Sequence, residues 1–354
     1  GNDTFVGGMR AISGTDFNTV SYSGATGPIS VTQSGAQLMV TGDVSVGTDT
    51  IVNADRIIGT AFNDTFTITD NYAGGQFNGY FSGSVLGTGV ENRQIEIRGG
   101  GGNDTINGNG VTRINYGNAT AGVTVNFGTG TATSTSTDAG IGTDTFTGVN
   151  AVVGSNFGDT LIGGATNTQF RGEGGNDIIT GGSATNDVID YSNSIDGVTV
   201  NLGLGTEQFI SIAQGSDTLN GIEDVRGSRN DDTLIGSSGN NRLRGDQGND
   251  YIDGGAGTDR AEYNSSTDGV TVNLNLQGAA QFISLSQGWD TLVSIEDVTG
   301  GEYNDNLTGD GNNNRLDGGY GTNTLIGGGG NDTFVGGMRA ISGTDFNTVS
   351  YSGA

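Results

Sequence analysis

Apolar side chains alternate with hydroxyl and amide side chains over short stretches of this chain, and glycine-rich segments separate the stretches. The segment GVTVNL, which begins at Gly197 and again at Gly269, is the clearest example. A period of two residues is typical of strands with one buried face, and no stretch combines a sustained 3.6-residue period with helix caps. The pattern predicts an all-β chain with almost no helix. The IEDV segments at Ile222 and Ile295 fit either a turn or a strand.

The strand segments recur in four repeats. Each repeat opens with a tyrosine shortly before a strand segment and later carries a Gly-x-Asp-Thr marker, as in GSDTL at Gly215 and GWDTL at Gly288. The repeats that begin at Tyr191 and Tyr263 are near copies. The predicted division is residues 1–21 as the end of a preceding array, repeats 22–115, 116–190, 191–262 and 263–350, and residues 351–354 as the start of a next repeat.

A longer period encloses these repeats, because residues 330–354 reproduce residues 1–25 letter for letter. A chance match of this length is negligible. We therefore expect the chain to be an excerpt from an array with a period of 329 residues, in which copies follow one another end to end, either covalently or as separate chains.

Nine-residue segments of the form Gly-x-x-Gly-Asn-Asp-x-hydrophobic-x lie between the markers. The four cleanest copies begin at Gly99, Gly172, Gly245 and Gly327. The first six residues favour a turn with positive φ, and the last three favour a short strand with one inward apolar residue. Two nonapeptides therefore complete one coil.

These nonapeptides resemble the calcium-binding repeats of the repeats-in-toxin (RTX) family of secreted bacterial proteins. The resemblance implies an elongated all-β fold, a parallel β-roll or β-helix solenoid whose half-coils are nonapeptides and whose linking segments are rich in strand. It also implies several bound Ca²⁺ ions.

The stacking of coils gives a physical reason for calcium. Sixth-position residues that are two nonapeptides apart lie on the same edge, about 4.8 Å from each other. Two carboxylates at that distance repel unless a cation lies between them, and Ca²⁺ accepts carboxylate and carbonyl oxygens with loose geometry. Turn carbonyls are expected to supply the remaining ligands.

The tandem nonapeptides define the candidate ligands. The same-edge pairs are Asp232 with Asp250, Asn241 with Asp259, Asp305 with Asn323, Asn314 with Asp332, and Asp159 with Asp177. Pairs that contain asparagine are expected to bind calcium more weakly. The remaining candidates are Asp187, which an inserted residue sets out of step with Thr168, Asp64 and Asp104, whose partners the sequence leaves open, and Asp3, which has the same repeat position as Asp332.

Composition removes most other classes of function. The chain has 39 acidic residues against 13 basic ones, all of them arginine, and it lacks His, Cys and Lys. Catalytic triads, cysteine nucleophiles, lysine Schiff bases and zinc sites with His or Cys ligands are therefore excluded. The carboxylate pairs Glu223/Asp224 and Glu296/Asp297 have no companion pocket signal, and we expect no enzymatic activity.

A formal charge of −26 makes nucleic acid a poor partner, since phosphate contacts require clustered basic residues. No run of apolar residues is long enough to insert into a membrane. Charge repulsion and the entropy of 69 glycines oppose folding, so ions that bind only the folded chain would stabilise it. The resemblance to RTX proteins implies that the chain stays unfolded in the calcium-poor cytoplasm, leaves by type I secretion and folds outside the cell or at its surface.

The leading hypothesis is a structural role: a calcium-stabilised repeat that forms an extended rod or filament in a matrix, surface layer or adhesin shaft. The alternative is a polysaccharide-binding or accessory RTX module of a secreted enzyme, with surface glycans as partners. An ice-binding repeat would require an unbroken Thr or Asn ladder, and the sixth-position pattern is broken. Phe209, Phe282 and Trp289 fit a sugar platform but are predicted to be core residues, and Arg242 and Arg315 are predicted to form ion pairs on a solvated edge.

Overall fold

The computed structural model of the chain contains two compact units, Gly1–Ala184 and Thr185–Ala354. It describes residues 1–7, 18–69, 77–78, 93–134, 136, 140–336 and 348–350. The predicted start of a next repeat at residues 351–354 lies outside the described residues, as do residues 8–17 and 337–347 of the duplicated segment.

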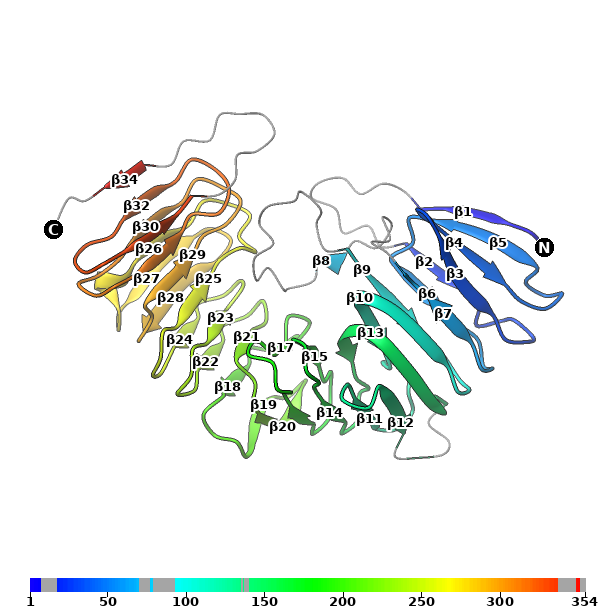
Figure 1. The fold of residues 1–354 in the computed structure, drawn as a ribbon. Helices are drawn as coiled ribbons and strands as arrows, with labels where there is room; N and C mark the ends of the chain where they lie inside the picture. Colours follow the sequence, from blue (N-terminus) through cyan, green and yellow to red (C-terminus); the bar gives the residue numbers. More distant parts are fainter. Residues whose placement is uncertain are drawn as a thin grey trace. The chain divides into compact units, whose positions relative to one another are not determined.

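The N-terminal unit, residues 1–184, contains only strands among its described residues (Figure 1). They are β1 (Thr4–Val6), β2 (Thr19–Ser21), β3 (Ser30–Ser34), β4 (Gln37–Thr41), β5 (Thr48–Val52), β6 (Arg56–Ile58), β7 (Thr65–Thr67), β8 (Phe77–Asn78), β9 (Arg93–Arg98), β10 (Thr105–Asn115), β11 (Val123–Asn126), β12 (Thr131–Ser134), β13 (Thr143–Val153), β14 (Thr160–Ile162), β15 (Gln169–Arg171) and β16 (Ile178–Thr180).

The C-terminal unit, residues 185–354, has the same character. Its strands are β17 (Val188–Asp190), β18 (Thr199–Asn201), β19 (Glu207–Ser211), β20 (Gly215–Asn220), β21 (Asp224–Arg226), β22 (Thr233–Ile235), β23 (Arg242–Arg244), β24 (Tyr251–Asp253), β25 (Arg260–Glu262), β26 (Thr271–Asn273), β27 (Ala280–Ser284), β28 (Gly288–Val293), β29 (Asp297–Thr299), β30 (Asn306–Thr308), β31 (Arg315–Asp317), β32 (Thr324–Ile326), β33 (Thr333–Val335) and β34 (Thr348–Ser350). A single 3-10 turn, η1 (Leu274–Leu276), is the one helix of the described ranges, and no helix there is long and apolar enough to cross a membrane.

Parallel ladders of short strands build each unit. In the N-terminal unit, β3, β7, β10 and β13 form one ladder, β6, β9, β10, β13 and β15 form a second, and the long strands β10 and β13 belong to both. In the C-terminal unit the ladders are β18–β22–β24–β28, β26–β30–β32–β34 and β17–β21–β23–β25–β29–β31–β33. The predicted all-β roll of parallel half-coils is confirmed.

The linking segments leave these ladders as antiparallel excursions. The antiparallel sets are β3–β4–β5, β8–β9, β11–β12–β13, β19–β20 and β27–β28. β5, β13 and β28 carry Gly-x-Asp-Thr markers and return to parallel pairing beside β1, β10 and β24. The marker therefore lies where a linking segment rejoins the coils. The IEDV segments also lead into strands, since β21 and β29 begin at their aspartates.

The core consists of narrow columns of apolar side chains. The middle residue of most three-residue strands points inward, and Val31, Phe66, Ile106 and Phe146 stand in register with none more than 5% exposed. An equivalent column in the C-terminal unit is Val200, Leu234, Ile252 and Leu292. Because a nonapeptide needs few inward residues, this fold can form at a hydrophobic content of only 32%.

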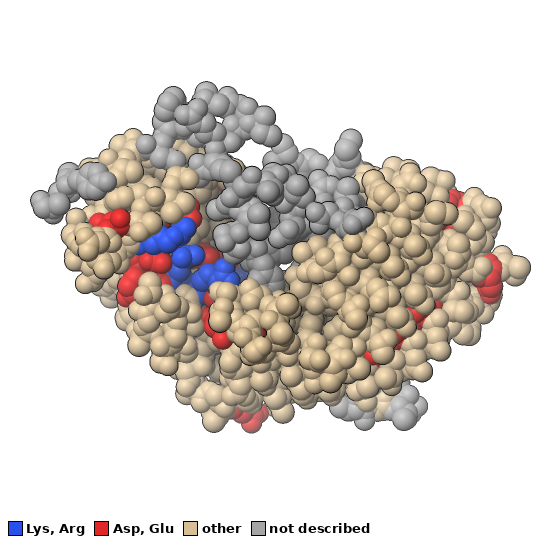
Figure 2. All heavy atoms as spheres, in the orientation of Figure 1, with Lys and Arg blue, Asp and Glu red and all other residues tan. Residues whose placement is uncertain are grey.

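Charged side chains form a column beside the core on one ladder of the C-terminal unit, where Figure 2 shows basic side chains gathered with acidic ones next to them. The column in register is Asp224, Arg242, Arg260, Asp297 and Arg315. The predicted ion pairs are present, from Arg242 to Asp224 and from Arg315 to Asp317 at 3.0 Å. Their surroundings differ from the prediction, because the two arginine side chains are only 17% and 32% exposed and belong to a half-buried ladder.

The prediction that Phe209, Phe282 and Trp289 are core residues is wrong. Their side chains are 63%, 45% and 54% exposed. Phe282 and Trp289 face each other across β27 and β28 with ring centroids 5.5 Å apart. The neighbouring residues of alternate parity, including Ile283 and Leu292, fill the interior instead.

Candidate metal centre

The sixth residues of the nonapeptides form hydrogen-bonded ladders along the turn edges. In each same-edge pair, the backbone N–H of the first residue donates to Oδ1 of the second. The distances are 2.9 Å from Asp232 to Asp250, 2.7 Å from Asn241 to Asp259, 2.8 Å from Asp305 to Asn323, 3.0 Å from Asn314 to Asp332 and 2.8 Å from Asp159 to Asp177. The structure thus brings together the five pairs that the tandem copies indicate.

The candidates without assigned partners also enter ladders. The N–H of Asp3 donates to Oδ1 of Asp49 at 2.8 Å, and the N–H of Asp187 donates to Oε2 of Glu223 at 2.8 Å. Thr168, the partner considered for Asp187, belongs to the other compact unit.

Asp64 and Asp104 are partners of each other, because the N–H of Asp64 donates to Oδ1 of Asp104 at 2.8 Å. The ladder continues to a residue outside the nonapeptides: the N–H of Asp104 donates to Oδ1 of Asp144 at 2.9 Å. In the same way, the N–H of Asp250 donates to Oδ1 of Asp290 at 3.1 Å. Asp144 and Asp290 are the aspartates of Gly-x-Asp-Thr markers.

In every repeat the opening tyrosine holds this marker aspartate. The hydroxyl donates to Oδ2 from Tyr22 to Asp49 at 3.0 Å, Tyr116 to Asp144 at 3.0 Å, Tyr191 to Asp217 at 2.7 Å and Tyr263 to Asp290 at 3.0 Å. In the sequence, these tyrosines and aspartates served only to mark the repeats and were not predicted to be ligands. A signal was present, since Gly-x-Asp-Thr-hydrophobic reproduces positions four to eight of the nonapeptide.

Position one of each turn is glycine because the sixth side chain lies against it. A Cβ on Gly245 would stand 1.9 Å from Oδ2 of Asp250, and a Cβ on Gly227 would stand 2.1 Å from Oδ2 of Asp232. Non-bonded heavy atoms do not approach so closely, so any side chain at position one displaces the sixth residue.

Residue two divides the turns into two types. In the first type, named capped turns, the N–H of residue two donates to the sixth side chain, and a Ser or Thr hydroxyl at residue two often adds a second bond. The N–H bonds are Thr60 to Asp64 at 2.6 Å, Ser155 to Asp159 at 2.6 Å, Ser228 to Asp232 at 2.6 Å, Ser237 to Asn241 at 2.7 Å, Gly301 to Asp305 at 2.7 Å and Asp310 to Asn314 at 2.8 Å. A backbone N–H at or just before the start of a strand, such as that of Val198 for Asp232, satisfies the other oxygen of each capped aspartate.

In the second type, named uncapped turns, residues two and four both have positive φ. At residue two the angles are 101° at Gly100, 69° at Glu173, 69° at Asp246, 88° at Gly255, 60° at Gly319 and 87° at Gly328. The sixth residues of these turns are Asp104, Asp177, Asp250, Asp259, Asn323 and Asp332.

Asp104, Asp250 and Asp259 each keep a buried Oδ2 that accepts no hydrogen bond from the described part of the chain. The three residues are at most 2% exposed. Burial, followed by the charge of Asp144, raises the pKa of Asp104 to about 8, and burial, followed by the charge of Asp290, raises the pKa of Asp250 to about 9. Burial also raises the pKa of Asp259 to about 6. A carboxylate oxygen in this position is costly unless a cation neutralises it.

On the other edge of the C-terminal unit, glutamates of the IEDV segments take the place of the marker aspartates. The N–H of Asp259 donates to Oε2 of Glu296 at 2.8 Å. The side-chain amides of Asn241 and Asn314 donate to the backbone carbonyls of Glu223 at 2.6 Å and Glu296 at 2.8 Å. Asparagine in a capped turn therefore has its own protein partners.

The donor set fits calcium. The atoms around each uncapped turn are carboxylate and carbonyl oxygens, which are the ligands that Ca²⁺ takes in proteins. Within the described ranges no three His, Cys, Asp or Glu side chains gather at one point, so carbonyl oxygens would complete the coordination. Asp104, Asp250 and Asp259 would hold the ion through Oδ2.

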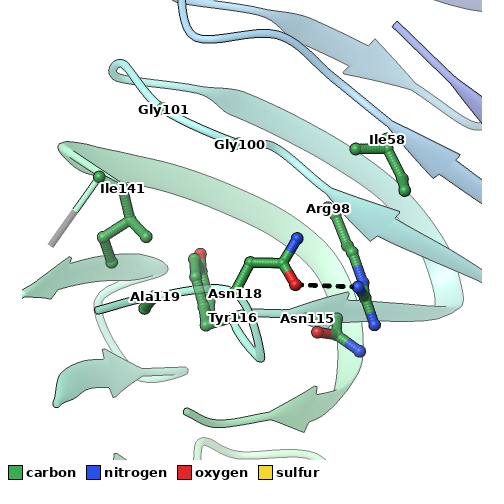
Figure 3. A pocket seen from close by; sticks show the side chains of 10 residues that line it. Ile58, Arg98, Gly100, Gly101, Asn115, Tyr116, Asn118, Ala119 and Ile141 are labelled. Atoms are coloured by element: carbon green, nitrogen blue, oxygen red, sulfur yellow. Dashed lines mark hydrogen bonds between the residues drawn. The ribbon is translucent and has the colours of Figure 1, made fainter. Parts of the chain in front are cut away.

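A pocket of about 170 Å³ adjoins the uncapped turn of Asp104 (Figure 3). Gly100 and Gly101 of that turn line it together with Tyr116, and Arg98 donates to Asn118 at 3.3 Å on its wall. The lining residues include no carboxylate, and the side-chain oxygens of Asn115 and Asn118 already accept hydrogen bonds from Gly117 and Arg98, so the pocket offers a cation no charged ligand.

Comparison with known protein families matches residues 96–110, 153–190, 226–261 and 297–337 to the family described as RTX calcium-binding nonapeptide repeat (4 copies). These segments contain every predicted site residue except Asp3 and Asp64. The marker aspartates and Glu296 lie outside them. No curated protein matches the chain.

Proposed function

The chain is an RTX repeat protein whose nonapeptides bind calcium, and we propose that it is a calcium-stabilised structural repeat of a secreted bacterial surface protein. In this role the ions hold successive coils together, and the repeats form an extended rod or filament in a matrix, surface layer or adhesin shaft. The chain has no catalytic activity of its own under this proposal.

One observation carries the proposal. Asp104, Asp250 and Asp259 each have a buried Oδ2 that receives no hydrogen bond from the described part of the protein. Each of these aspartates also accepts an N–H from the coil before it. An ion at Oδ2 therefore strengthens a contact between coils, which is the contact on which a solenoid depends.

The proposed place of folding rests on the stabilisation of the folded chain by bound calcium. RTX repeats are typical of exported proteins. At free calcium 100 times Kd, one site stabilises the folded chain by about 2.7 kcal/mol. We propose that the chain is unfolded in the calcium-poor cytoplasm, passes through type I secretion and folds at the cell surface or outside the cell.

The duplicated segment supports copies of the period as end-to-end partners. Asp3 and Asp332 have the same repeat position. Asp332 accepts the N–H of Asn314 at 3.0 Å, and Asp3 donates its N–H to Asp49 at 2.8 Å. If one residue at a junction between two periods made both bonds, the ladder would have the order seen elsewhere in the chain: a capped turn, an uncapped turn and a marker aspartate.

Small-angle X-ray scattering on one period and on two periods in a single polypeptide tests this proposal. In millimolar calcium the longest dimension should increase by about the same amount for the second period as for the first, and a chelator should convert both into expanded chains. A double period that collapses into a compact particle, or scattering that is indifferent to chelation, contradicts the proposal.

A second function has one observation in its favour. The exposed rings of Phe282 and Trp289 lie 5.5 Å apart and offer an apolar face to a sugar. Under this alternative the chain is a polysaccharide-binding or accessory module of a secreted enzyme. Trp289 is the only tryptophan, so its fluorescence reports directly on this surface. Polysaccharide binding that Trp289→Ala abolishes and Tyr303→Ala preserves would favour the alternative, whereas unchanged fluorescence across a glycan panel would count against it.

A further inference from the structure

Asn323 lies in an uncapped turn and carries its own donor into it. Its side-chain Nδ2 donates to three carbonyl oxygens of that turn, at 3.5 Å to Gly319, 3.1 Å to Tyr320 and 3.4 Å to Gly321. These are residues two, three and four of the turn. The amide nitrogen therefore stands at a point where three carbonyl oxygens converge.

The turn of Asp104 has the same backbone but no such donor. Residues two and four have φ of 60° and 92° at Gly319 and Gly321, and 101° and 94° at Gly100 and Gly102. In both turns the sixth side chain presses on position one: a Cβ there would lie 2.6 Å from Nδ2 of Asn323 and 1.9 Å from Oδ2 of Asp104. Oδ2 of the aspartate thus takes the place of the amide nitrogen, and nothing positive in the described chain separates it from the carbonyls.

A second carboxylate reaches the aspartate turns from the linking segments. Asp144 and Asp290 accept the N–H groups of Asp104 and Asp250, and Glu296 accepts that of Asp259. Tyr116 and Tyr263 fix the two aspartates by their hydroxyl bonds of 3.0 Å. All three linking carboxylates lie outside the segments that match the nonapeptide family.

We propose that the turn type and the sixth residue together decide where calcium binds. One ion occupies each of the uncapped turns of Asp104, Asp250 and Asp259, with its second carboxylate from Asp144, Asp290 or Glu296. In the turn of Asn323 the amide replaces the ion, so that turn binds no calcium. The inference rests on the proposed calcium role and assigns ligands from linking segments to it.

Asn323→Asp in the full chain tests the amide half of the proposal. By isothermal titration and metal analysis, this variant should bind one more Ca²⁺ per chain than the unmodified protein, because a donor has become a carboxylate. Asn313→Asp is the matched control: it lies at an exposed fifth position, where its side-chain oxygen accepts the N–H of Asn331 and an aspartate can keep that bond, and it should add no ion. An unchanged ion count in folded Asn323→Asp, or an equal gain in Asn313→Asp, overturns the proposal.

Asp290→Asn tests the linking carboxylate. Its amide oxygen can still accept one of the two hydrogen bonds that Asp290 receives, from the Tyr263 hydroxyl or from the N–H of Asp250, so the variant should keep its far-UV circular dichroism in calcium while binding one ion fewer. Asp231→Asn removes the same charge from an exposed fifth position and should retain every ion. A full ion count in Asp290→Asn overturns this half. The two variants change separate turns, so the misfolding of one leaves the other as a test. An unmodified chain that binds no calcium defeats the proposed function itself, whereas a chain that binds calcium with counts unmoved by the variants defeats only this inference.

Discussion

The conformation of one residue decides whether a buried carboxylate is satisfied by the protein. Ser228 gives both its N–H and its hydroxyl to Asp232, whereas Asp246, at the same position of the next coil, has φ of 69° and leaves Oδ2 of Asp250 without a donor. Positive φ at a residue other than glycine costs about 1–3 kcal/mol. The uncapped turn therefore persists against two local penalties, which a bound cation offsets.

The buried hydroxyl of Tyr263 donates to Asp290 at 3.0 Å. Tyr263→Phe should lower the free energy of unfolding in calcium by about 1.5–3 kcal/mol, since the bond is made to a charged group. Urea titration measures the loss. Tyr251→Phe, on an exposed ring, is the control and should change stability by less than about 0.5 kcal/mol; equal effects of the two substitutions would refute the role of the hydroxyl.

The raised pKa values of Asp104 and Asp250 give a pH prediction for the calcium-free chain. With pKa values of about 8 and about 9 against an ordinary 3.8, the folded state binds more protons than the unfolded state between these limits. These groups stabilise the fold when protonated, and that contribution is lost as pH rises towards 9. Trimethylamine N-oxide favours the compact state and folds the calcium-free chain; in chelator with this osmolyte the melting temperature should fall between pH 6 and pH 9.

Saturating calcium is the control for this pH dependence, because the ion binds the ionised carboxylates and removes the reason for the loss. The melting temperature in calcium should then stay level or rise over the same range. A calcium-free chain that gains stability as pH rises from 6 to 9 would contradict the account.

Among the turns and strands, the sequence predicts which sixth positions stack, because stacking depends on the nine-residue period. It does not predict which turns are capped, because capping depends on the backbone conformation of residue two. A nine-residue period stacks sixth positions after two nonapeptides, which is why pairs such as Asp232 with Asp250 are found in advance. Serine or threonine at residue two is a readable sign of a capped turn. Gly301 and Asp310 cap without a hydroxyl, and nothing in their identity separates Gly301 from the uncapped Gly319.

The linking segments show a second limit. An alternating strand has two faces, and the period alone does not say which face is inward; Phe282 and Trp289 proved to be on the outer one. Asp144 and Asp290 were not predicted to be ligands, because each lies in an incomplete nonapeptide. The excursion that returns through β13 or β28 takes the place of the missing residues.

The glycine at position one of a nonapeptide turn is expected to be necessary for the shape of that turn. Gly245→Ala places a Cβ 1.9 Å from Oδ2 of Asp250, so the turn must shift. Steric strain of this kind costs about 1–3 kcal/mol, and calcium affinity should fall with it. Gly311→Ala, in another nonapeptide turn, meets no atom within 4 Å and is the matched control. Guanidinium unfolding curves in calcium compare the two, and equal stability would contradict the steric account.

Over the whole molecule, a charge of −26 and 69 glycines oppose folding, and the narrow apolar columns do not compensate with a broad core. Candidate ions lie at Asp104 in the N-terminal unit and at Asp250 and Asp259 in the C-terminal unit. We therefore expect each unit to depend on calcium in its own right. Salt screens repulsion between exposed charges but supplies no ligand to a buried carboxylate, so sodium chloride should not replace calcium.

The decisive experiment on the calcium dependence of the fold is a calcium titration of the full chain, followed by far-UV circular dichroism together with the number of ions bound. We expect a disordered spectrum in chelator, a cooperative change to a β spectrum as calcium rises to millimolar concentration, and reversal on chelation, with no such change in sodium chloride of equal ionic strength. A β spectrum that is already complete in chelator, with no ion bound on addition of calcium, would contradict this expectation.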